Sequence, residues 1–138
     1  RMVAAAFFDP FEYLMLRHKA GKLKTVFQKS LGKVSYQVPC HLRVQNIGLK
    51  TRDILELIPN TQVQAIERCS GHDGTYAVKE KYNAISRKIA QPVARQVKDA
   101  QAEHFTSDCP MAAEQIASVS DVAEPTHPMS LLRRAYGI

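Results

Sequence analysis

Three short segments of the chain have the alternating or concentrated apolar positions that are typical of buried strands. In the second of them, Val63, Ala65 and Ile66 are interleaved with polar residues. Each segment is followed by a turn rich in glycine, proline or small polar residues. The pattern therefore predicts three strands, over residues 33–38, 62–67 and 103–106.

Apolar positions at helical spacing predict helices around these strands. Asp9 and Pro10 are a suitable N-cap and first helical residue, and Gly21 ends the segment. Pro92 is expected to kink a long helix or to begin a new one. The further helices are expected at 49–58, at 75–90 with a continuation to about 100, from Pro110 onward, and after His127-Pro128. Val122-Ala123 is expected to form a short fourth strand.

Strands that alternate with helices favour an α/β fold with a small parallel sheet of three to four strands, flanked by helices. We expect residues 33–138 to form this domain and residues 1–32 to form an N-terminal helix and a basic connector. At 138 residues the chain is long enough for one domain with its own core.

Charge and composition narrow the function classes. The net charge is +6, but the basic residues are scattered and no strip of aromatic and basic residues is present, so we expect no nucleic-acid partner. No apolar run reaches the length of about 20 residues that a membrane helix needs. The opening apolar stretch, residues 2–8, lacks the layout of a signal peptide. We expect a cytoplasmic location, with attachment to the inner face of the membrane as the alternative.

The three cysteines each follow a predicted strand. Cys40, Cys69 and Cys109 would thus lie at the carboxyl ends of parallel strands, where such sheets bind ligands. Soft thiolates favour iron–sulfur clusters, zinc or copper(I). Gly71 and Gly74 would let backbone amides approach the sulfurs, and we expect positive φ at one or both. The alternative for each single cysteine is a small buried hydrophobe.

The same residues resemble a known family, the cysteine-rich CCG domain. The likeness extends over about residues 33–136 and rests on four motifs in order: Val34-Ser35-Tyr36-x-x-Pro39-Cys40-His41-Leu42, Cys69-x-Gly71-x-x-Gly74-Thr75-Tyr76, Ser107-Asp108-Cys109-Pro110, and His127-Pro128-x-x-Leu131-Leu132. This domain is found in the B subunit of heterodisulfide reductase, the C subunit of anaerobic glycerol-3-phosphate dehydrogenase, and iron–sulfur subunits of glycolate and lactate oxidation.

The resemblance implies the distal CCG unit of a longer iron–sulfur oxidoreductase, and the start at Arg1 agrees with a C-terminal piece. The chain departs from the family pattern in two places. Cys69-Ser70-Gly71 stands where the family has Cys-Cys-Gly, and Ala112 stands where it has its last cysteine. Three thiolates can still hold a 4Fe–4S cluster. The fourth iron would then stay open, bind a ligand from another domain, or bind His41 or His72.

Three hypotheses remain open. In the first, Cys40, Cys69 and Cys109 hold a cluster that exchanges electrons with a partner subunit or a small redox substrate. In the second, the domain is a cluster-free or zinc-stabilised module for subunit docking. In the third, one cysteine is a nucleophile beside His41 or His72.

Two acidic residues lie next to the predicted cysteine site. Asp73 and Asp108 flank it and would orient a histidine, relay a proton, or cap a turn. Expected partners are other domains of the parent chain, redox subunits, or a second copy of this chain. We expect the isolated fragment to be inactive, and a domain cut from its parent chain can be isolated without its metal.

Overall fold

The computed structural model describes residue 3 and residues 6–138, so residues 1–2 and 4–5, within the opening stretch, lie outside the described residues. Its elements follow one another along the chain as α2 (Pro10–Lys19), β1 (Gly32–Gln37), α3 (Cys40–Gln45), α4 (Lys50–Leu55), β2 (Thr61–Ile66), α5 (Glu80–Asp99), β3 (His104–Ser107), α6 (Pro110–Ala117) and α7 (Pro128–Tyr136). Among these residues, no helix is both long and apolar enough to cross a membrane.

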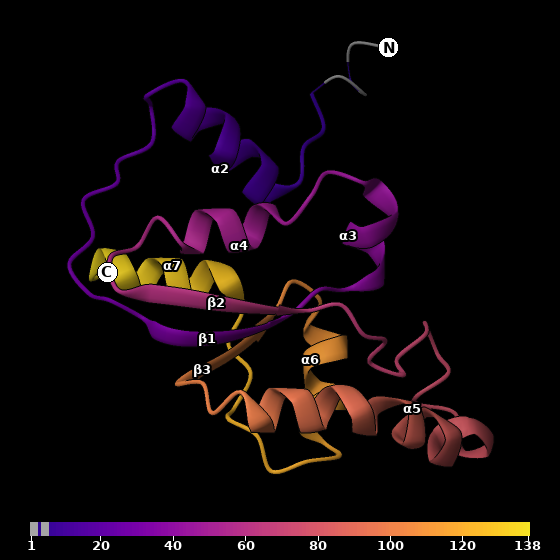
Figure 1. Cartoon of the computed structure of the whole chain (residues 1–138). Coiled ribbons are helices and arrows are strands. Elements are labelled where there is room, and N and C mark those ends of the chain that lie inside the picture. The colour runs from indigo at the N-terminus through magenta and orange to yellow at the C-terminus, as the bar shows by residue number, and fades with distance from the viewer. Residues whose placement is uncertain (1–2, 4–5) are drawn as a thin grey trace.

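The three strands form one parallel sheet in the order β2-β1-β3. Val34 of β1 lies opposite Val63 of β2 and His104 of β3, so the first strand in sequence is the central one. Helices α2, α4 and α7 lie on one side of the sheet, and α5 and α6 lie on the other (Figure 1). The expected α/β fold with a parallel sheet is confirmed.

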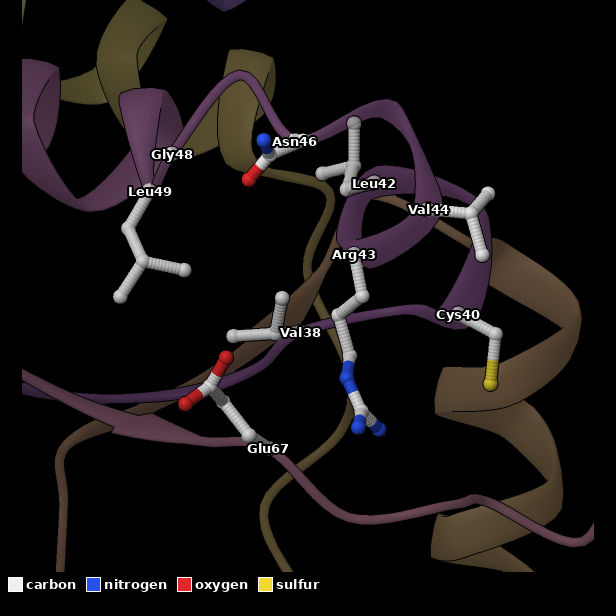
Figure 2. Close-up of a pocket in the computed structure, with 9 residues that line it drawn as sticks. All are labelled: Val38, Cys40, Leu42, Arg43, Val44, Asn46, Gly48, Leu49 and Glu67. Carbon is white, nitrogen blue, oxygen red and sulfur yellow. The ribbon is translucent and has the colours of Figure 1, made fainter.

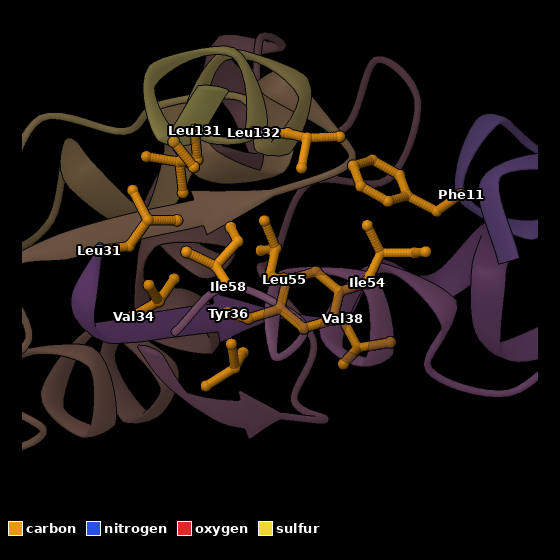
Figure 3. Close-up of a cluster of buried hydrophobic side chains, with 12 residues drawn as sticks. Phe11, Leu31, Val34, Tyr36, Val38, Ile54, Leu55, Ile58, Leu131 and Leu132 are labelled. Carbon is orange, nitrogen blue, oxygen red and sulfur yellow. The ribbon is translucent and has the colours of Figure 1, made fainter. Parts of the chain in front are cut away.

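One apolar core fills the space between the sheet and α2, α4 and α7 (Figure 3). Side chains alternate between the two faces of a strand, and Val34, Tyr36 and Val38 point into this core. Helix α4 adds Ile54 and Leu55, which are fully buried. The other members of the cluster are Phe11, Leu31, Ile58, Val63, Leu131, Leu132 and Ala135.

A second apolar core lies between the sheet and helices α5 and α6. It contains Ile66, Val93, Ala94, Val97, Phe105, Ala113 and Ile116. The intervening residues of β1, Ser35 and Gln37, are polar yet buried. Burial of both faces of β1 agrees with a central strand of a parallel sheet, and the Gln37 amide requires partners that an apolar core cannot supply.

Three local expectations need correction. Cys40 begins the short helix α3 instead of lying in the turn that we expect after the first strand. Helix α5 runs without a break from Glu80 to Asp99 with Pro92 inside it, so Pro92 does not begin a new helix. The fourth strand expected at Val122-Ala123 is wrong: in the described part of the chain this region forms a single bridge, between Phe105 and Pro125.

Candidate functional site

The first cysteine follows the central strand. Strand β1 ends at Gln37, and after Val38 and Pro39 the chain enters α3 with Cys40 as its first helical residue. Pro39 is the N-cap residue of α3, and its backbone is extended, with φ fixed near −72° by the proline ring. Cys40 is exposed to solvent. The thiol is therefore accessible at the carboxyl edge of the sheet.

The second cysteine lies in the loop after β2, and hydrogen bonds hold this loop against α5 and α6. The backbone N–H of Gly71 points to the Cys69 sulfur at 3.4 Å. The carbonyl of Gly71 accepts a hydrogen bond from the Ser86 hydroxyl at 2.7 Å, and Gln115 donates to that hydroxyl at 2.8 Å. The loop is thus fixed in a shape that directs a backbone amide to a cysteine sulfur.

Both glycines of this loop have positive φ, +75° at Gly71 and +52° at Gly74, as expected. Their surroundings differ. A Cβ on Gly71 would lie 2.3 Å from the backbone oxygen of Ser86, whereas no atom lies within 4 Å of a Cβ on Gly74. Gly71 therefore serves both the turn and the close approach of the loop to α5.

The third cysteine is the N-cap residue of α6, and Pro110 is the first residue of that helix. Cys109 is partly exposed. Its backbone N–H donates to the Ser107 hydroxyl at 3.3 Å. All three cysteines consequently follow the carboxyl ends of parallel strands, as the sequence predicts.

The structure brings two of the three thiols close to each other. Partial burial raises the pKa of Cys40, the nearby Cys69 raises it further, and the guanidinium of Arg43 opposes both effects. Among residue 3 and residues 6–138, no three His, Cys, Asp or Glu side chains are close enough to hold a metal ion. Cys109 lies at the same edge but outside such a group, so the site shared by all three stays a prediction.

The two candidate histidines lie beside these cysteines in the chain. His41 is exposed on α3, and His72 is partly exposed in the loop that follows Cys69. The backbone N–H of His72 donates to the Ser70 hydroxyl at 3.3 Å, which stabilises a turn. Ser70 itself is buried. The imidazole rings of His41 and His72 are accessible, which is compatible with binding a metal and with hydrogen bonding alone.

Asp108 has a defined structural role next to Cys109. Its two carboxylate oxygens accept hydrogen bonds from the Tyr36 hydroxyl at 2.5 Å and from the Thr51 hydroxyl at 2.8 Å. Burial raises the pKa of Asp108, and the two hydroxyl donors oppose that rise. Burial and the neighbouring Asp108 also raise the pKa of Tyr36. This carboxylate therefore connects β1, α4 and the Cys109 loop.

A shallow pocket of about 580 Å³ opens beside Cys40. Figure 2 shows the Arg43 guanidinium reaching down between Glu67 and the side of the pocket that carries Cys40. The remaining lining residues are Val38, Leu42, Val44, Asn46, Gly48 and Leu49. Sequence reasoning missed Arg43, because an arginine on a short helix carries no pattern that separates it from a solvated surface residue.

Fold and site together define a class: a small parallel α/β domain with a cysteine after each strand at the carboxyl edge. Comparison with known families matches residues 34–116 to CCG, described as a cysteine-rich domain. The chain belongs to the CCG cysteine-rich domain family.

Two curated proteins are similar to the chain. They are the C subunits of the anaerobic glycerol-3-phosphate dehydrogenases of Escherichia coli K12 and Escherichia coli O157:H7, each 32% identical over 104 residues. The match extends over 75% of this chain and 26% of each relative, so the chain spans about a quarter of their length. No solved structure matches the chain.

Proposed function

We propose that this chain is an electron-transfer domain of an iron–sulfur oxidoreductase, in which Cys40, Cys69 and Cys109 hold a cluster of the 4Fe–4S type. The observation that carries the proposal is the placement of all three cysteines after the carboxyl ends of parallel strands, with the Gly71 amide directed at the Cys69 sulfur. Membership of the CCG family and the similarity to a dehydrogenase subunit support it.

The residues present fit such a group in their chemistry. Thiolates are the usual ligands of iron–sulfur clusters, and the cluster, when bound, supplies reversible one-electron transfer. An N–H group that donates to a sulfur stabilises negative charge on that sulfur. The Gly71 amide is such a donor at the sulfur of Cys69. Burial and the nearby Cys69 raise the pKa of Cys40, and the cation of Arg43 offsets part of this rise.

The fourth coordination position is proposed for His41, His72 or a group from another part of the assembly. Since the similar dehydrogenase subunits are about four times longer than the matched segment, further domains and a redox partner subunit are the proposed neighbours. An intracellular, reducing setting is proposed because the free thiols would otherwise be open to oxidation.

The test is metal analysis of the full 138-residue chain, produced and purified without oxygen. The expected result is iron and acid-labile sulfide in equal amounts, with a brown visible absorption that bleaches on addition of dithionite and returns on reoxidation. Stoichiometric zinc without iron would favour the docking module. Metal-free protein that resists reconstitution with iron and sulfide would contradict the proposal for this chain.

A further inference from the structure

Gln37 is the last residue of the central strand β1, and its side chain is only 1% exposed. It lies between Ile66 at the end of β2 and Ser107 at the end of β3. A buried amide in this position is unfavourable unless its polar atoms are hydrogen-bonded. The hydrogen-bond partners of the Gln37 amide therefore show which segments this side chain connects.

The amide nitrogen of Gln37 binds two backbone carbonyls that precede cysteines. It donates to the oxygen of Val38 at 2.9 Å and to the oxygen of Arg68 at 3.0 Å. Val38 lies two residues before Cys40, and Arg68 lies directly before Cys69. One –NH₂ group thus connects the loop after β1 to the loop after β2.

The amide oxygen of Gln37 reaches the third cysteine through one intermediate. It accepts a hydrogen bond from the Ser107 hydroxyl at 2.8 Å, and the Ser107 oxygen accepts the N–H of Cys109 at 3.3 Å. Ser107 is 2% exposed, so water does not compete for these bonds. The chain of hydrogen bonds leads from the Cys109 backbone to the other two loops.

We infer that Gln37 is a positioning residue that ties all three cysteine loops to a single side chain. The geometry requires an amide, because two donors must face the carbonyls of Val38 and Arg68 while an acceptor faces Ser107. Glutamate has no donors, and aliphatic side chains have neither. That the tie sets the positions of cluster ligands rests on the proposed function, whereas the tie between the loops does not.

The experiment compares Gln37→Met with Ser35→Ala. Ser35 lies on the same buried face of β1, and within residue 3 and residues 6–138 its hydroxyl has no hydrogen-bond partner. Its replacement by alanine therefore removes a buried polar group from the same strand without breaking a hydrogen bond to a cysteine loop. Backbone hydrogen exchange is measured on the metal-free full chain. Gln37→Met should speed exchange about tenfold in the three segments 38–42, 67–72 and 107–111 together, because buried carbonyls lose their donors. Ser35→Ala should not.

A second pair of variants decides the matter where Gln37→Met does not fold. Ser107→Ala removes the hydroxyl that joins Gln37 to Cys109, and Ser107→Thr keeps it. Ser107→Ala should speed exchange mainly in segment 107–111, and Ser107→Thr should restore the protection. Equal acceleration by both variants, or a uniform acceleration of the whole chain by Gln37→Met, would overturn the inference.

The same variants separate this inference from the proposed function. After anaerobic reconstitution with iron and sulfide, Gln37→Met should bind less iron and show an altered visible spectrum, whereas Ser35→Ala should match the unsubstituted chain. If the unsubstituted chain binds no iron and the three loops still loosen together, the tie stands and the proposed function fails. If iron binds fully and exchange in the loops is unchanged in Gln37→Met, the tie fails and the proposed function stands.

Discussion

At the scale of single residues, Gly71 and Gly74 form a natural comparison. Both have positive φ, which a residue with a Cβ adopts at a cost of about 1 kcal/mol or more. Only at Gly71 would the new methyl group also collide with the backbone of α5, at Ser86. The backbone strain is common to both positions, and the steric term belongs to Gly71 alone.

We therefore expect Gly71→Ala to lower the free energy of unfolding by about 2–4 kcal/mol, and Gly74→Ala by about 1 kcal/mol. Urea denaturation of the two metal-free variants measures both values, with Gly74→Ala as the matched control. Equal losses at the two positions would mean that the loop is not held against α5 as described.

The candidate residues could be predicted from the sequence where glycine or cysteine marks them, as at Cys69 and Gly71. Gln37 could not, because a glutamine that alternates with valine and tyrosine looks like an ordinary solvent-facing position of a strand. It becomes buried because α5 and α6 cover that face of β1, which is a tertiary effect.

At the scale of elements, Pro92 interrupts the hydrogen bonds of α5 without ending the helix. Proline has no N–H, so the carbonyl of Lys88 lacks its usual helical donor. Neighbouring Val93 and Ala94 are buried against the second core, and this packing holds the helix together across the proline.

Pro92→Ala is expected to raise the free energy of unfolding by about 1–2 kcal/mol, because it restores the donor and relieves crowding at the preceding turn, partly offset by a more flexible unfolded chain. The measurement is again urea denaturation. Gln91→Ala, at an exposed position next to it, should change stability by less than about 0.5 kcal/mol. A loss of stability in Pro92→Ala would show that the proline is required by the fold.

The strands and the long helices could be predicted because their apolar positions repeat over many residues. Helix α3 could not: it has six residues, and only Leu42 among them is buried. The prediction of a fourth strand at Val122-Ala123 is wrong for a related reason. Val122 packs against the second core, and Pro125, which forms the single bridge with Phe105, has no N–H to extend a ladder.

At the scale of the whole molecule, the parallel topology explains why three cysteines far apart in sequence share one edge of the sheet. That much follows from a strand before each cysteine. The distances between the sulfurs do not follow, because they depend on α3, on the Gly71 contact with Ser86 and on the cap of α6. These are contacts between distant segments.

The central claim is that Cys40, Cys69 and Cys109 bind one cluster together. The most direct measurement is iron per chain after anaerobic reconstitution of Cys40→Ser, Cys69→Ser and Cys109→Ser, beside the unsubstituted chain. Met111→Leu is the control, since it changes an exposed side chain of α6 and removes no thiol. We predict that each serine variant loses most of its iron and that the control keeps it. Full iron in Cys109→Ser, with loss in the other two, would contradict a site shared by all three.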